Sequence, residues 1–450
     1  MLKQGTRVLV TGGAGFIGSQ VTRALTAAGC HVRVLDDLSH GKRERLDGLG
    51  SRLELLHADI RNSGAVEKAA KGANVIVHLA ATPVGSDPAR AQEVNLGGVL
   101  NVLNYARAVD RNERPRVILC GSGAVYGRQP AFVLHEELAP HPSLPQAVMA
   151  LAAESYGRVY REAYGVQVIN LRIFRTFGAY EDPERPDSSV VSRFIRCALD
   201  GTSPVIHGDG QQTRDLICID NVVAAILAAA EHDPGPEPLN IGSGEAVAIN
   251  FLWTLVLELL GKKRLVIEPT YVPALPWDPK HARPQIQRSC KLLGGWAPSV
   301  RLREGLQRTA KHYLDLRSAD PNAWFAPKED SVSATLPRRP TRPPILPPRP
   351  SHKTPPPVPP QAAQPSMSTM PARPSQSSAS STAARTPLPA RPMPTPPPSR
   401  TPTPTSPPLA EVVELTADML IEAETSLSLD DGQDLDFEWA PVPVVPGMSR

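Results

Sequence analysis

One unit at the start of this 450-residue chain constrains the fold more than any other part. Residues 7–10, Arg-Val-Leu-Val, read as a buried strand, and residues 31–36, which end on the acid Asp36, read as a second strand. Three glycines follow the first run at intervals of three residues and open a helical pattern: Gly12, Gly15 and Gly18. Glycines so placed let the backbone turn tightly and let a pyrophosphate approach the helix N-terminus. The unit predicts a dinucleotide-binding fold.

Asp36 indicates which dinucleotide fits. It follows the glycines by about 20 residues, the place of an acid that hydrogen-bonds a ribose. Its charge would repel a 2′-phosphate, so the sequence predicts NAD rather than NADP as the cofactor. The predicted cofactor contacts at this end of the chain are Gly12, Gly15, Phe16, Ile17, Gly18 and Asp36.

Strand and helix patterns continue to alternate through the first half of the chain. The next β-rich runs fall at 53–57, 74–79, 116–120 and 166–172, and helical stretches separate them at 63–71, 90–109 and about 146–164. Such alternation predicts a Rossmann-type, doubly wound parallel sheet covered by helices on both faces. We therefore expect an NAD-binding domain over 1–175 and a smaller α/β substrate domain over 176–318.

Proline marks the end of this pattern. Of the 50 prolines, 19 lie in the range 1–320 and 31 in the much shorter range 321–450. The sequence predicts a disordered, basic, proline-rich linker over 319–410, because such a composition buries too little apolar surface to offset its ordering entropy. Residues 411–450 form an acidic tail, in which 411–424 has the spacing of a short amphipathic helix formed on binding; a solvated acidic tail is the other interpretation.

Charge and composition exclude several classes of protein. The net charge of +3, and of +5 over 1–318, is too small for nucleic acid to be the main partner. The longest apolar run, 251–260, is too short to span a bilayer and contains Glu258. The five cysteines lie far apart without metal-ligand spacing, which excludes a zinc site and suits a reducing, cytoplasmic compartment. We expect no metal, no membrane partner and no nucleic acid.

Further motifs follow in order along the chain. The chain carries Asp59-Ile60, His78-Leu79-Ala80-Ala81, Asn95, the segment 208–215 that includes Arg214, the segment 240–244 and Gly295-Trp296-Ala297-Pro298. With the glycine unit, they resemble the NAD-dependent epimerase/dehydratases, the extended short-chain dehydrogenase/reductase family typified by UDP-glucose 4-epimerase. The resemblance covers about residues 5–316.

The resemblance implies further site residues. It places Asp59 and the amide of Ile60 against adenine, and it lines the cofactor with Leu79, Ala80, Ala81 and Asn95. It implies that Arg214 and Arg283 bind the substrate, because a guanidinium suits the diphosphate of a nucleotide sugar. It also implies a nucleotide-sugar ligand and a homodimer. A second interpretation stays open for each of two residues: Asn95 as a residue that ties loops by hydrogen bonds, and Arg214 as part of a surface ion pair.

The same resemblance exposes a departure at the catalytic positions. The family uses a Ser or Thr, a Tyr that exchanges a proton with the sugar hydroxyl, and a Lys four residues later that lowers the Tyr pKa. Ser122 is retained. Pro145 and Glu154 fix the register, so that Gln146 stands at the Tyr position and Ala150 at the Lys position. Neither side chain carries a titratable proton.

Three interpretations remain open at this point. The first is an NAD-binding family member that has lost most or all of its activity and serves sensing or scaffolding, with the 331–440 tail as a protein-binding element. The second is an active nucleotide-sugar 4-epimerase, dehydratase or reductase with another base, drawn from Ser122, Tyr126, His135, Glu136 and His141. In the third, the tail alone carries the function on an inert scaffold.

Overall fold

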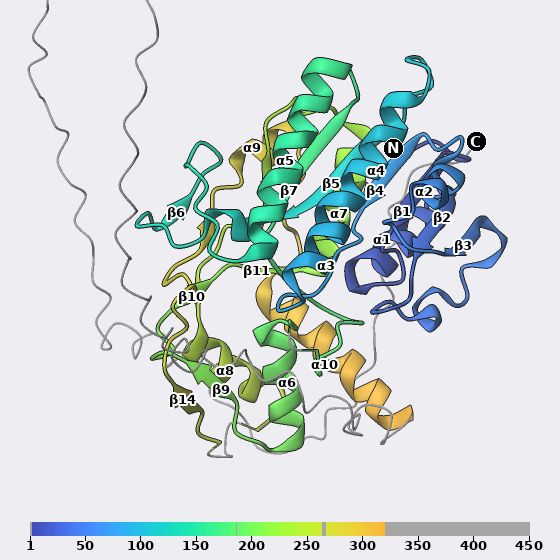
Figure 1. The fold of residues 1–450 in the computed structure, drawn as a ribbon. Helices are drawn as coiled ribbons and strands as arrows, with labels where there is room; N and C mark the ends of the chain where they lie inside the picture. Colours follow the sequence, from blue (N-terminus) through green and yellow to red (C-terminus); the bar gives the residue numbers. More distant parts are fainter. Residues whose placement is uncertain (1, 186, 263–266, 320–450) are drawn as a thin grey trace, which may run out of the picture. The chain divides into compact units, whose positions relative to one another are not determined.

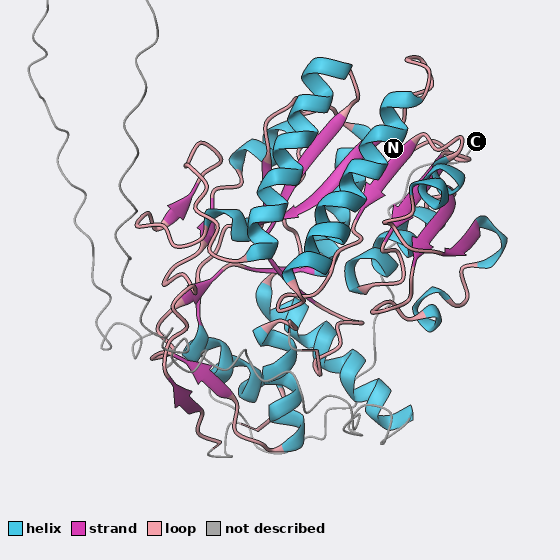
Figure 2. Cartoon of the chain, in the orientation of Figure 1, coloured by secondary structure: helices cyan, strands magenta, loops and turns pink. Residues whose placement is uncertain are grey.

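The computed structural model describes residues 2–185, 187–262 and 267–319 (Figure 1, Figure 2). The predictions for the tail beyond 319 lie outside the described residues. Within the described part, a seven-stranded parallel sheet confirms the expected Rossmann-type architecture. No helix there is long and apolar enough to cross a membrane.

The sheet has the strand order of a doubly wound fold. Its strands, from one edge to the other, are β12 (Leu239–Ile241), β7 (Val168–Ile173), β5 (Arg116–Ser122), β4 (Val75–His78), β1 (Arg7–Thr11), β2 (His31–Asp36) and β3 (Leu53–His57). All six neighbouring pairs are parallel. The order reverses between β1 and β4, and in open α/β sheets ligands bind at the carboxyl ends of the strands beside such a reversal. The glycine loop leaves β1 at this point.

Helices cover both faces because side chains alternate along each strand. On β1, Val8 and Val10 belong to the core shared with α1 (Phe16–Ala27) and α7 (Ile219–Glu231). Leu9 belongs to the core on the opposite face. That face is covered by α2 (Ser63–Ala70), α4 (Gly98–Ala108) and α5 (Pro145–Tyr164) (Figure 1).

The helix predicted over 90–109 is divided. It comprises α3 (Pro88–Gln92), one π turn over Glu93–Gly97 and then α4. Asp87 caps the start by accepting hydrogen bonds from the amides of Ala89 and Arg90, at 3.0 Å each. A Cβ at Gly98 would lie 2.9 Å from Ile60, so the helix passes closer to the β3–α2 loop than any other residue would permit.

A second group of helices comes from the later part of the chain. It contains α6 (Val190–Asp200), α8 (Ile249–Leu259) and α10 (Leu302–Ala319), which pack on one another. The short elements are η1 (Arg43–Leu46), η2 (Gly50–Arg52), η4 (Gly123–Tyr126), β6 (Val133–Leu134), β8 (Arg175–Phe177), β9 (Val205–His207), β10 (Thr213–Arg214), β11 (Leu216–Cys218), β13 (Val247–Ala248), β14 (Thr270–Val272), β15 (Arg283–Pro284) and α9 (Gln287–Leu292).

The range 176–318, expected as a substrate domain, also contributes elements to the main sheet. β12 pairs with β7 inside the main sheet, and α7 packs against α1 beneath it, although both elements come from the range assigned to the substrate domain. The chain thus leaves the sheet after β7 and returns to it once, through α7 on one face and then β12 at the edge. A linear reading of strand and helix patterns misses this, because β12 is very short and its partner β7 lies far earlier in the chain.

Candidate functional site

The glycine loop joins β1 to α1 at the reversal of strand order. Gly12 has a φ of +70°, and a Cβ there would lie 2.7 Å from the backbone nitrogen of Ala80. A Cβ at Gly18 would collide with the carbonyl oxygen of Gly12. Gly15 is the N-cap of α1 and no side chain caps its amides. The first turn of this helix thus presents backbone N–H groups, among them those of Phe16 and Ile17, at a place that suits a pyrophosphate.

The loop after β4 lies against the glycine loop. The Thr11 hydroxyl is 2.9 Å from Nδ1 of His78, and it also accepts hydrogen bonds from the amides of Leu79 and Ala80 at 3.3 and 3.4 Å. Burial lowers the pKa of His78 to about 4, so its ring is neutral and holds the two loops together. Leu79 and Ala80 therefore stand beside Gly12, where the sequence placed a cofactor wall.

Asp36 is buried at the end of β2, with 7% of its surface exposed. Its carboxylate accepts hydrogen bonds from the amides of Ala14 and Leu38, each at 2.9 Å, which ties the β2–η1 loop to the glycine loop. Burial raises the pKa of Asp36, and these two amides oppose that rise. Each oxygen keeps acceptor capacity after one amide bond, so a ribose hydroxyl has a partner here.

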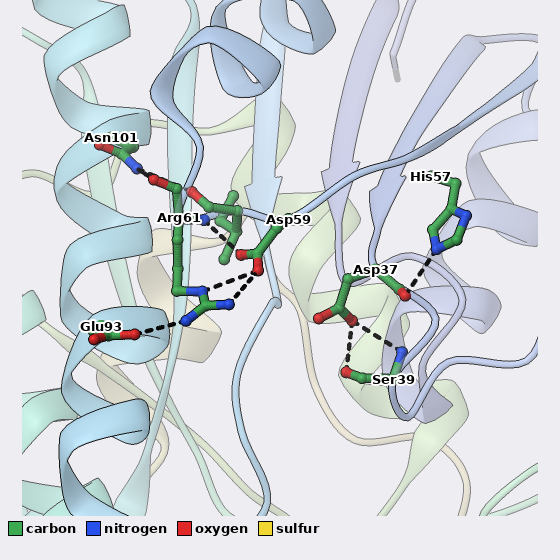
Figure 3. A network of polar contacts seen from close by, with 8 residues as sticks. Asp37, Ser39, His57, Asp59, Arg61, Glu93 and Asn101 are labelled. Atoms are coloured by element: carbon green, nitrogen blue, oxygen red, sulfur yellow. Dashed lines mark hydrogen bonds and ion pairs between the residues drawn. The ribbon is translucent and has the colours of Figure 1, made fainter.

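Beyond β3 and β4, a chain of charges spans the expected adenine end (Figure 3). Oδ2 of Asp59 accepts hydrogen bonds from Nε and Nη2 of Arg61 at 2.9 and 2.7 Å, and Nη1 of Arg61 reaches Glu93 at 2.6 Å. Asn101 donates to the carbonyl oxygens of Ile60 and Arg61, both at 3.0 Å. The Arg61 guanidinium holds the pKa of Asp59 below its ordinary value.

This network borders an open depression of about 600 Å³, lined by Asp59, Arg61, Asn62, Glu93, Gly97 and Asn101. Across from it, Asp37 accepts hydrogen bonds from the amide and hydroxyl of Ser39, and His57 contacts the Asp37 carbonyl oxygen at 3.0 Å (Figure 3). Asp59 was predicted from the sequence, whereas Arg61 and Glu93 were not. Asp59, Arg61 and Glu93 carry charges of alternating sign. They come into contact only because α3 approaches the β3–α2 loop, which the sequence does not reveal.

Asn95 ties the loop that leads from β4 to α3. Its Oδ1 accepts hydrogen bonds from the amide of Thr82 at 2.8 Å and from the Thr82 hydroxyl at 3.3 Å. Ala81 lies between this tie and the Ala80 contact with Gly12. The loop-tying role, one of the two left open by the sequence, is thus present, and it fixes the wall on which Leu79, Ala80 and Ala81 lie.

Ser122 and the two replaced positions lie around the ends of β5 and α5. The Ser122 hydroxyl accepts a hydrogen bond from the amide of Ala124 at 3.1 Å and caps η4. Gln146 is the second residue of α5, and its amide donates to the carbonyl oxygen of Pro83 at 3.4 Å. Ala150, one turn later, packs on the small apolar cluster of Val125, Tyr126, Leu134 and Phe174.

The titratable residues near these positions are engaged elsewhere. Tyr126 is fully buried, its hydroxyl lies 2.8 Å from Oδ1 of Asn240 and 2.8 Å from Nη1 of Arg172, and burial raises its pKa. Glu136 is buried and accepts a hydrogen bond from the Asn240 amide at 3.0 Å. His135 lies 3.0 Å from Glu137 in an exposed pair.

Sequence analysis did not foresee this buried network. Arg172 points from β7 to Glu154 on α5 with two bonds of 2.7 and 2.8 Å, and its side chain is only 4% exposed. The available signal was an arginine inside the strand run 168–173, whose other residues are apolar except Asn170. The contact with Tyr126 and Asn240 depends on long-range packing.

At the substrate end, Arg214 is buried and forms an ion pair of 2.5 Å with Asp278. Arg283 donates from Nε to the carbonyl oxygen of Gly244 at 2.8 Å. Asp215 is buried and fastens the same turn, since it accepts hydrogen bonds from the amides of residues 243–245 and from the Ser243 hydroxyl. Burial raises the pKa of Asp215 to about 6.

Arg175, on β8, is exposed and makes no hydrogen bond or ion pair through its side chain with the described residues. In the parallel pair of β8 with β11 it lies opposite Leu216, close in sequence to Arg214. The pKa of Arg214 is lowered first by burial and further by the charge of Arg175, while Asp278 opposes both effects. A second arginine, Arg193 on α6, lies within the electrostatic reach of Arg175.

The described residues were also compared with the side-chain clusters that bind metal ions. In residues 2–185, 187–262 and 267–319, no three His, Cys, Asp or Glu side chains gather in a way that would hold an ion. All five cysteines are free thiols.

Comparison with known proteins gives one family. The model of the NAD dependent epimerase/dehydratase family matches residues 8–242. A UDP-glucose 4-epimerase of Mycolicibacterium smegmatis is 32% identical over 314 residues, which cover 68% of this chain and 98% of the relative.

Solved structures agree with this relationship. The UDP-glucose 4-epimerase of Thermotoga maritima with UDP-glucose superposes with a TM-score of 0.63 at 31% identity, over 69% of this chain and 99% of that chain. The UDP-glucose 4-epimerase of Thermus thermophilus in complex with NAD gives a TM-score of 0.61 at 30% identity, over 68% and 99%. The strand order, the glycine loop and these matches together show that the chain belongs to the NAD-dependent epimerase/dehydratase family.

Proposed function

We propose that this protein binds NAD and a nucleotide sugar in the manner of its family, but has lost most or all of the proton transfer that the family's chemistry requires. The observation that carries the proposal is the start of α5, where Gln146 and Ala150 occupy successive turns beside the loop after β4. Neither residue exchanges a proton near neutral pH. Removal of a positioned acid–base group costs about 10²–10⁴-fold in rate.

The residues present fit NAD, the cofactor of the family. A Cβ at Gly12 or Gly18 would clash with neighbouring backbone, so these glycines keep the loop in its tight turn, and the uncapped amides of α1 suit the pyrophosphate. We assign the ribose to Asp36, the adenine to Asp59 and Ile60, and the remaining wall to Leu79, Ala80, Ala81 and Asn95. NAD, when bound, would supply a hydride acceptor, and these residues would orient it.

Charge supports the substrate half of the proposal. Arg175 and Arg193 are exposed, and neither side chain makes a hydrogen bond or ion pair among the described residues, while the paired Arg214 lies close to Arg175. Mutual repulsion among these guanidiniums is relieved by an anion placed between them. The diphosphate of a nucleotide sugar has the charge and geometry for this role. Arg283 holds the neighbouring turn at Gly244 and acts as a positioning residue.

The alternative of an active enzyme with a different base has little support from the candidates. Tyr126 and Glu136 are buried in hydrogen bonds to Asn240, and the Tyr126 pKa is raised, which makes a phenolate harder to form. Ser122 has a hydroxyl near the site, but a serine hydroxyl alone is too weak a base at neutral pH. On this proposal, none of Ser122, Tyr126 and Glu136 takes over the role of the pair lost at 146 and 150.

A sensing or scaffolding role follows as part of the proposal. A protein that keeps the cofactor site and loses proton transfer reports NAD or nucleotide-sugar levels through binding alone. A partner for the tail, a homodimer and a cytoplasmic location belong to the same proposal.

The test combines occupancy and turnover in the purified full-length chain. We expect NAD to raise the unfolding temperature in a concentration-dependent manner. We expect UDP-sugars to do so further, while epimerisation, dehydration and oxidation of a nucleotide-sugar panel stay near background. Efficient conversion of UDP-glucose to UDP-galactose would refute the loss of catalysis, and absence of any NAD-dependent shift would refute the cofactor assignment separately.

A further inference from the structure

A basic pocket lies at the opposite end of the sheet from the glycine loop. It measures about 520 Å³, and its lining includes Arg7, His31, Arg33, Arg52, Lys71 and Glu54. Arg7 and His31 are the first residues of β1 and β2, whereas the cofactor residues follow the last residues of those strands. A strand of about five residues at about 3.3 Å each separates the two ends by roughly 16 Å. The pocket is therefore distinct from the nucleotide site.

The pocket carries an excess of positive charge. Arg33 is neutralised by Glu54 at 2.8 Å and also donates to the carbonyl oxygen of Ala69 at 2.7 Å. Arg7, Arg52 and Lys71 are exposed, and the structure gives them no acidic partner among the described residues. Three unpaired cations around one concavity repel one another, and an anionic occupant removes that repulsion.

The origin of these cations in the chain favours an extended anion over a compact one. They come from three separate segments, since Arg7 begins β1, Arg52 ends η2 just before β3, and Lys71 directly follows α2. A single phosphate satisfies two or three neighbouring donors. A run of carboxylates on a peptide contacts cations distributed in this way one by one.

The chain itself contains a matching sequence. Residues 411–440 hold ten Asp and Glu side chains and no Lys or Arg. The range 320–410 separates this acidic segment from the last described helix. At about 3.1 Å per residue in polyproline II, a tether of this length extends to roughly 280 Å. A folded part of this size has a radius of gyration of about 20 Å, so the tether reaches any face of it.

We propose that the basic pocket at the amino ends of β1 to β3 is a docking site for the acidic segment 411–440. Covalent connection raises the effective concentration of the segment, which compensates for ion pairs that are individually weak at an exposed surface. The contact depends on salt, because exposed charges are screened within about 8 Å at physiological ionic strength. Its role is to hold the tail against the folded part until salt or a competing basic partner releases it.

Zero-length carbodiimide cross-linking of the full-length chain tests this directly, because the reagent joins a lysine to a carboxylate in contact with it. Lys71, directly after α2, lines the pocket, whereas the exposed Lys68 in the last turn of α2 does not, so the two form a matched pair. We expect cross-links from 411–440 to Lys71 at least fivefold more often than to Lys68. They should fall at least fivefold in 0.5 M NaCl and in an Arg52→Glu variant that retains its NAD-induced thermal shift.

Three outcomes would overturn the proposal. One is equal labelling of Lys68 and Lys71. Another is preferential linkage to Lys353, the single lysine of the basic stretch 331–410, which would place the acidic segment on its own linker. The third is cross-links that join isotopically light and heavy chains in a mixed sample, which would assign the segment to a second copy.

Discussion

Gln146 donates its side-chain amide to the carbonyl oxygen of Pro83, with 3.4 Å between the nitrogen and the oxygen. Pro83 follows the loop whose residues Ala80 and Thr82 contact Gly12 and Asn95. The start of α5 is therefore tied to the same wall that borders the glycine loop. On the proposed function, position 146 is where the family's chemistry requires a proton-exchanging group.

From this geometry we expect Gln146→Tyr with Ala150→Lys to create nucleotide-sugar turnover at least about 10²-fold above that of the natural chain. The lysine at i+4 lies on the same helix face as the tyrosine and lowers its pKa. Its methylenes replace Ala150 against the apolar cluster while its ammonium extends beyond it. Turnover of UDP-glucose and UDP-galactose is measured with NAD present.

The matched control is Val148→Tyr with Ala152→Lys, which has the same spacing from an exposed position two residues along α5. It should stay at background. Equal gains in both double variants would contradict the assignment of position 146 to the site.

A second prediction concerns the glycine loop. Gly18→Ala places a methyl group against the carbonyl oxygen of Gly12, so the loop has to shift away from its present path. We expect NAD affinity to fall at least tenfold, equivalent to about 1.4 kcal/mol, by calorimetric titration. Gly64→Ala, where a Cβ would meet only ordinary contact with Asn62 at 3.4 Å, should leave NAD affinity unchanged. An unaltered affinity in Gly18→Ala would remove the loop from the cofactor site.

Local sequence was enough to predict the cofactor half of the molecule. The segment from Arg7 to Asp36 folds as one strand–helix–strand unit, and its special residues act over short distances. Glycines at 12 and 18 are required by contacts with Ala80 and with the loop itself. For this reason pattern and spacing identified the fold and the glycine loop.

Contacts between distant segments were not predictable in the same way. β12 joins the main sheet long after the chain has left β7, and Arg172 finds Glu154, Tyr126 and Asn240 on three separate elements. The sequence left Arg214 open between a diphosphate contact and a surface ion pair, and Arg214 is in fact buried and paired with Asp278 from a loop far along the chain. Such pairings depend on which loops the fold brings together.

The third prediction tests Arg175. Arg175→Asn removes an exposed cation that the described residues leave unpaired, and it should weaken binding of UDP-sugars about tenfold, the effect of losing one charge-assisted hydrogen bond. NAD affinity should not change, because Arg175 lies beyond the cofactor loops. Arg158→Asn, which removes an exposed arginine on α5, is the control. A loss shared by both variants would indicate a general charge effect instead of a diphosphate contact.

A fourth prediction concerns pH and Asp215. Its pKa in the folded protein is about 6, against an ordinary value of about 3.9. Since the folded state holds this proton more tightly, Asp215 favours folding below about pH 4, and that contribution is lost as the pH rises through 6. We expect the stability of the natural chain relative to Asp215→Asn to decrease by on the order of 2 kcal/mol between pH 4 and 7, measured by urea unfolding. A pH-independent difference would contradict the raised pKa.

The last prediction concerns the buried pair of Arg172 and Glu154. Arg172 is 4% exposed at its side chain, and two hydrogen bonds of 2.7 and 2.8 Å connect it to the carboxylate. Glu154→Leu leaves the guanidinium buried with only Tyr126 and a carbonyl oxygen as partners, so we expect a loss of about 3–5 kcal/mol in the free energy of unfolding. Adding Arg172→Met removes the uncompensated charge and should recover most of that loss. Urea unfolding of the two single variants and the double variant measures the coupling, and purely additive losses would show that the pair contributes no interaction of its own.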